Sequence, residues 1–161
     1  MSKIHKLLGL AVVLPLLLIS CGSQTLYDQQ VELPQQGWFM NEAVKFDVYI
    51  VDTIVPYDFN LTLRHSTDYR YSNLYVFMTT RFPNGKISRD TIECLLADAA
   101  GRWTGGGWGK IRDEEVNLRT QLHFPQSGQY QFFIQQAMRT DTLKEISHVG
   151  LRLVVSEDGN D

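Results

Sequence analysis

Apolar residues recur at every second position along most of this chain. In the segment 43–52, "AVKFDVYIVD", Val44, Phe46, Val48 and Ile50 follow one another at a spacing of two. Successive side chains of a β-strand point to opposite faces, so this spacing gives a strand one apolar side. The same spacing occurs in segments 57–63, 71–82, 116–124 and 149–155. The pattern predicts a protein made of strands whose apolar sides share one core.

Turn signals separate these segments. Pro83-Asn84-Gly85-Lys86 lies between two apolar runs, and Asn-Gly tolerates positive φ, so we expect a hairpin there. Only "TDTLKEIS" (140–147) suggests a helical turn. Seven or eight strands without a helix of any length predict an all-β protein, an antiparallel β-sandwich of immunoglobulin-like or jelly-roll type. The sequence leaves the strand order open.

The N-terminus has the form of a bacterial lipoprotein signal. Lys3 and Lys6 precede an apolar run of about a dozen residues, which is too short to span a bilayer but fits a secretory signal. The run ends in Leu18-Ile19-Ser20-Cys21, which resembles a lipobox. In such proteins the chain is cut before the Cys, which then carries a diacylglyceryl group and a further acyl chain such as palmitate. We therefore expect lipidation at Cys21 and stable membrane anchoring through several acyl chains.

These signals divide the chain into four expected parts. Residues 1–20 are the signal peptide, 21–36 a polar lipidated tether, 37–156 the β-sandwich, and 157–161 a disordered tail. No acid follows Cys21 until Asp28. Lipoproteins exported to the surface of Bacteroidetes usually carry an acidic cluster at that point, so we expect the outer membrane and its periplasmic face.

Charge and cysteine content exclude several classes of protein. The signal contains two of the fifteen Lys and Arg residues and none of the eighteen acids, so the mature chain has a formal charge of −5. An acidic domain does not suit nucleic-acid binding. With Cys21 lipidated, Cys94 has no partner for a disulfide, and its apolar neighbours predict a buried structural thiol.

The segment 101–111, "GRWTGGGWGKI", has five glycines and two tryptophans. It fits neither a Walker-type phosphate loop, because Ile111 follows Gly109-Lys110, nor the dinucleotide pattern G-x-G-x-x-G. Two interpretations stay open. Trp103 and Trp108 can cover the open end of the sandwich from a bulged corner, or they can stand exposed and stack on a sugar ring or a partner side chain.

A second aromatic set precedes the predicted hairpin. Tyr69, Tyr71, Asn73 and Tyr75 would share one strand face, either half covered by loops or as a platform for a partner. We take Tyr71 and Tyr75, with Trp103 and Trp108, as candidate contacts for a partner protein or glycan. The histidines lack zinc-site spacing and no G-x-S-x-G elbow occurs, so we expect no enzyme activity, no metal and no cofactor.

The segments 69–111 and 136–153 together resemble the gliding-motility lipoprotein family GldH of the Bacteroidetes. The resemblance rests on "NLYVF", "DTIE", the "LADAAGRWTGGGWG" loop and "MRTDTL", and it extends from Trp38 to Leu153. The family pattern has Gly at the position of Glu145, so the turn that follows Met138 is expected to depart in detail.

The resemblance implies a lipid-anchored accessory protein of the gliding apparatus, which is coupled to type IX secretion. It implies protein–protein docking in the envelope and transfers only one residue role, lipidation at Cys21. Hosts that do not glide also encode such proteins, so a broader role in envelope assembly is a related expectation. A glycan-binding β-sandwich lipoprotein that uses the tryptophans of the 101–111 loop is the alternative.

Overall fold

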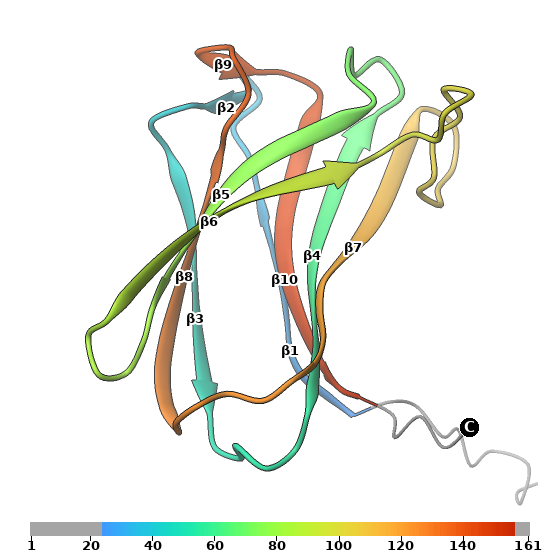
Figure 1. Cartoon of the computed structure of the whole chain (residues 1–161). Helices are drawn as coiled ribbons and strands as arrows, with labels where there is room; N and C mark the ends of the chain where they lie inside the picture. Colours follow the sequence, from blue (N-terminus) through green and yellow to red (C-terminus); the bar gives the residue numbers. More distant parts are fainter. Residues whose placement is uncertain (1–23, 157–161) are drawn as a thin grey trace, which may run out of the picture.

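A computed structural model describes residues 24–156 of the chain. The predicted signal peptide, the lipidation site Cys21 and the predicted tail 157–161 lie outside the described residues. Ten strands and no helix make up the described part (Figure 1). Their bounds are β1 (Thr25–Glu32), β2 (Trp38–Phe39), β3 (Ala43–Ile50), β4 (Tyr57–Ser66), β5 (Asn73–Arg81), β6 (Ile87–Leu95), β7 (Ile111–Leu122), β8 (Gly128–Gln136), β9 (Thr142–Leu143) and β10 (Ile146–Val155).

Eight long strands form two antiparallel sheets, and the predicted all-β fold is confirmed. One sheet has the order β1-β10-β4-β7 and the other β3-β8-β5-β6. The first long strand thus pairs with the last, the second with the seventh, the third with the sixth and the fourth with the fifth. This nesting of strand pairs is the jelly roll, which decides between the two sandwich types that the sequence left open.

The apolar rows predicted from the sequence face the space between the sheets. In β3, Phe46, Val48 and Ile50 are buried while Lys45 and Asp47 are exposed. The rows of β4, β5 and β10 do the same; their buried members include Phe59, Leu61, Leu63, Leu74, Val76, Leu151 and Leu153. Fully burying one such side chain contributes about 1.5–3 kcal/mol. The hairpin turn is also confirmed, with Gly85 at φ 81°.

Residues 25–36 do not form the expected tether. Thr25–Glu32 is strand β1, which pairs along its whole length with β10, and Leu33 is buried. The side chains of β1 are mostly exposed and polar, because β1 is an edge strand held by backbone hydrogen bonds. It therefore lacks the apolar alternation that revealed the other strands, although residues 25–33 belong to the folded domain.

The segment 140–147 contains no helical turn. Its Thr142–Leu143 is strand β9, which pairs with β2 so that Leu143 lies opposite Trp38. Both side chains are buried, and Trp38 Nε1 donates a hydrogen bond to the Glu42 carbonyl at 2.9 Å. This ribbon lies over one end of the sandwich (Figure 1). Leu143 adds more stability by covering the core than a single helical turn would.

The strand register gives the sandwich two distinct ends. Thr25 of β1 pairs with Val154, and Tyr57 of β4 pairs with Val155, so β1 begins at the end where β10 finishes. We call this the β1-start end. At the opposite end β7 begins, paired with the last residue of β4, and β5 and β6 meet at the pair Asn73 and Leu95. The four candidate contacts, Tyr71, Tyr75, Trp103 and Trp108, belong to this opposite end.

Candidate partner-binding site

The loop between β6 and β7 divides into a packed half and a projecting half. Trp103 is half-buried, forms an isolated bridge with Ala97 and packs on the core, with its ring centroid 4.8 Å from that of His65. Trp108 is 92% exposed. Trp103 therefore covers the end of the core, as the first interpretation expects. Trp108 stands in solvent, and its contact with a sugar or a partner stays a prediction.

A buried carboxylate fastens the packed half of the loop. Glu114 of β7 faces the core and accepts a hydrogen bond from Thr104 Oγ1 at 2.7 Å. The backbone passes so close that a Cβ on Gly105 would lie 2.5 Å from the Asp113 carbonyl oxygen and 2.7 Å from Glu114 Oε1. The glycine at 105 is therefore required by close approach, which is a structural explanation for part of this glycine-rich run.

Tyr69, Tyr71, Asn73 and Tyr75 do not share a strand face. β5 begins only at Asn73, so Tyr69 and Tyr71 lie in the β4–β5 loop. Tyr69 turns inward, is buried, and donates a hydrogen bond to the Asn73 carbonyl at 3.1 Å. Tyr71 packs edge-on against Tyr69, with centroids 5.5 Å apart, and stays 43% exposed. The period-two pattern of the sequence did not reveal that the strand starts only at Asn73.

Tyr71 stands between two hollows in the surface. One has a volume of about 460 Å³ and is lined by the rings of Tyr71, Tyr75 and Phe77 together with Met138 and Arg139. Tyr75 N–H points to the Met138 sulfur at 3.3 Å, which holds the thioether beside the rings. A side-chain hydrogen bond with Glu93 raises the pKa of the Tyr75 phenol above its ordinary value.

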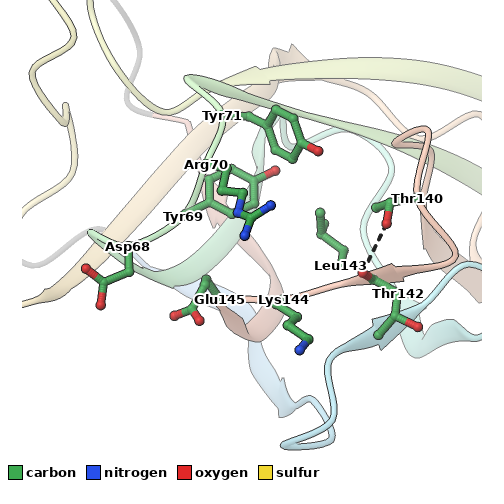
Figure 2. Close-up of a pocket in the computed structure, with 9 residues that line it drawn as sticks. All are labelled: Asp68, Tyr69, Arg70, Tyr71, Thr140, Thr142, Leu143, Lys144 and Glu145. Atoms are coloured by element: carbon green, nitrogen blue, oxygen red, sulfur yellow. Dashed lines mark hydrogen bonds between the residues drawn. The ribbon is translucent and has the colours of Figure 1, made fainter.

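The second hollow, of about 410 Å³, lies between the β4–β5 loop and the segment around β9. Figure 2 shows Arg70 and Tyr71 on one side of it and Lys144 on the other. Thr140 and Thr142 add hydroxyl groups, and Thr140 Oγ1 donates to the Thr142 carbonyl at 3.2 Å. We call the residues Arg70, Tyr71, Tyr75, Met138, Arg139 and Lys144 the Tyr71 face.

Three cations of the Tyr71 face are free to meet a partner. Arg70, Arg139 and Lys144 form no ion pair with any of residues 24–156. The neighbouring Lys110 is different, because the Asp68 carboxylate 2.9 Å away neutralises it and raises its pKa. This end therefore presents aromatic rings beside three unpaired cations, and the carboxylate of Glu145 also lines one of the two hollows.

The cations were not found from the sequence because they lie on separate segments that only the fold brings together. Arg70 precedes β5, whereas Arg139 and Lys144 follow β8, and pairing of β5 with β8 places the two segments side by side. No residue spacing signals such a set. Glu145 lines the same hollow with φ 71°, a conformation that favours glycine. The resemblance noted from the sequence predicts a glycine at this position.

The remaining chemistry of this end is structural. Cys94 is fully buried, as predicted, and burial raises its thiol pKa to about 12, so the thiol is neutral near pH 7. His65 is also buried, and its Nδ1 donates to the Ser66 carbonyl at 3.0 Å. Within residues 24–156 no three potential metal ligands gather at one point. The described residues also include no helix that is long and apolar enough to cross a membrane.

Comparison with known proteins finds relatives over nearly the whole chain. The family model described as GldH lipoprotein matches residues 25–153. A protein of Christiangramia forsetii named gliding motility lipoprotein GldH homolog is 31% identical over 150 residues, which is 89% of this chain and 91% of that protein. The gliding motility lipoprotein GldH of Flavobacterium johnsoniae is 26% identical over 152 residues, covering 90% and 94%. No solved structure matches the chain.

Proposed function

Because the chain belongs to the GldH lipoprotein family, we propose that it is a non-enzymatic component of the gliding and type IX secretion machinery that docks partner proteins through the Tyr71 face. We place its lipid anchor on Cys21 and the domain at the periplasmic face of the outer membrane. The relatives' names state a gliding motility lipoprotein.

The observation that carries the proposal is the composition of the Tyr71 face. Two exposed tyrosines, a methionine and three cations without ion pairs line two adjoining hollows. Tyrosine and arginine are enriched among the residues that dominate protein–protein binding energy, and methionine is enriched in interface cores. The open cations favour a partner that presents carboxylates, since complementary charge speeds association and fixes orientation.

The location of the Tyr71 face supports the same function. Three residues separate Cys21 from β1, and β1 begins at the β1-start end, opposite the Tyr71 face. A protein held at one end by lipid leaves the other end free for the machinery beside it.

Site-specific photocrosslinking in native membranes tests the proposal. A photoreactive residue at position 71 is expected to capture a gliding or secretion protein, whereas the same residue at Thr120, exposed on edge strand β7, should not. Capture should weaken as salt increases and fall when Arg70 and Lys144 are replaced by Ala. Equal capture at both positions would overturn the assignment of the Tyr71 face. If deletion of the gene left gliding and secretion intact, the function itself would be refuted.

One observation favours a second candidate, the glycan-binding lipoprotein. Trp108 is 92% exposed between two glycines, and an exposed indole on a projecting loop can stack on a sugar ring. Glycan-array binding that disappears in Trp108→Ala but persists in Tyr71→Ala would support it. A silent array would count against this candidate.

A further inference from the structure

The loop between β3 and β4 carries the most exposed large aliphatic side chains of residues 24–156. Val51 is 72% exposed and Ile54 is 84% exposed. Tyr49, near the end of β3, is 61% exposed. The segment from Tyr49 to Tyr57 contains a single charged residue, Asp52. Exposed apolar groups of this kind mark a contact surface where a partner lies within reach.

Hydrogen bonds hold this loop in one shape. Asp52 Oδ1 accepts from the backbone N–H groups of Ile54 at 2.7 Å and Val55 at 3.2 Å. The Tyr57 hydroxyl donates to the Asp52 carbonyl at 3.2 Å. Val55 packs against the core while Ile54 points away from it. The Asp52 carboxylate, which carries the only charge of the segment, is therefore bound by backbone N–H groups of its own loop. The side chains of Val51 and Ile54 extend outward from a backbone that these bonds hold in place.

Gln24, the first described residue, lies near this loop. Val155 N–H donates to the Gln24 carbonyl at 2.8 Å, and Ser156 N–H donates to the Pro56 carbonyl at 3.0 Å. Gln24 and Pro56 thus flank the end of β10, and two strand spacings separate them by about 10 Å. Cys21 lies three residues before Gln24, a reach of at most about 11 Å. Acyl chains on Cys21 would therefore enter a bilayer close to Ile54.

We infer that the β3–β4 loop inserts into the interfacial layer of the membrane that holds the Cys21 lipid. Val51 and Ile54 meet the acyl chains, and Tyr49, with its apolar ring and polar hydroxyl, lies at headgroup depth. The lipid and the loop then form two attachment points, which fix the tilt of the domain and direct the Tyr71 face away from the bilayer. The inference rests on the proposed function only through the lipid on Cys21.

Depth measurement on the full lipoprotein tests this inference. The protein is reconstituted in vesicles of phosphatidylethanolamine and phosphatidylcholine with a nitroxide on Ile54→Cys. Cys21 is acylated and Cys94 is buried with a raised thiol pKa, so the introduced cysteine is labelled selectively. Leu95→Cys is the matched control, because Leu95 is a 64% exposed aliphatic residue at the opposite end. Both positions are exposed, so neither substitution disturbs the core.

We expect collisions of the label at 54 with a water-soluble nickel complex to be severalfold rarer than at 95, and collisions with oxygen to be more frequent. Adding Val51→Ser to the Ile54→Cys protein should restore part of the nickel access. Equal nickel access at 54 and 95 on vesicle-bound protein would overturn the loop insertion while leaving the lipid anchor and docking function standing. Protein that washes off the vesicles would overturn the Cys21 anchor and, with it, this inference.

Discussion

Replacement by alanine should destabilise the protein at one tryptophan of the β6–β7 loop and leave its stability nearly unchanged at the other. Trp103 is half-buried against His65 and the core, whereas Trp108 is 92% exposed. Removing a fully buried aromatic side chain costs about 3–5 kcal/mol, and scaling this for half burial gives about 2 kcal/mol for Trp103→Ala. Trp108→Ala should change the free energy of unfolding by less than about 0.5 kcal/mol.

Thermal unfolding followed by far-ultraviolet circular dichroism measures this difference without relying on tryptophan emission. For a domain of this size a loss of 1 kcal/mol lowers Tm by about 4 °C. Trp103→Ala should therefore melt about 8 °C below the parent protein, and Trp108→Ala within about 2 °C of it. Equal Tm losses in the two variants, or a larger loss for Trp108→Ala, would refute the division of the loop into a packed and a projecting half.

Three further predictions concern single residues. Gly105→Ala should lower the free energy of unfolding in urea by about 2 kcal/mol or more, because its Cβ would meet the Asp113 carbonyl. Gly106→Ala is the control, since a Cβ there has nothing within 4 Å, and equal costs in the two variants would contradict the close approach. Glu145→Gly should gain about 0.5–1 kcal/mol by relieving φ 71°, whereas Lys144→Gly should lose stability, and a loss in both would argue against strain. Cys94 should resist alkylation at pH 8, because burial raises the pKa of its thiol from 9.0 to about 12. The unfolded chain therefore loses the thiol proton at lower pH than the folded protein, so stability should fall between about pH 9 and 12. Cys94→Ala should reduce this decline.

The sequence revealed the strands that bury a regular apolar row and missed β1, β2 and β9, which do not. β3, β4, β5 and β10 alternate clearly because each has one side in the core. β1 and the two-residue strands β2 and β9 are held by backbone hydrogen bonds or by one buried side chain, so they leave little periodicity to find. The same limit placed Tyr69 and Tyr71 in a strand that starts only at Asn73.

By itself the sequence determined the fold class and the family, because alternation, turn residues and a run of specific motifs are local properties of the chain. It also identified Cys94 as a core residue from its apolar neighbours. The tertiary structure decided the jelly-roll order, the separate roles of Trp103 and Trp108, and the gathering of Arg70, Arg139 and Lys144 around Tyr71. These depend on pairing between strands far apart in the chain, which no local pattern of residues encodes.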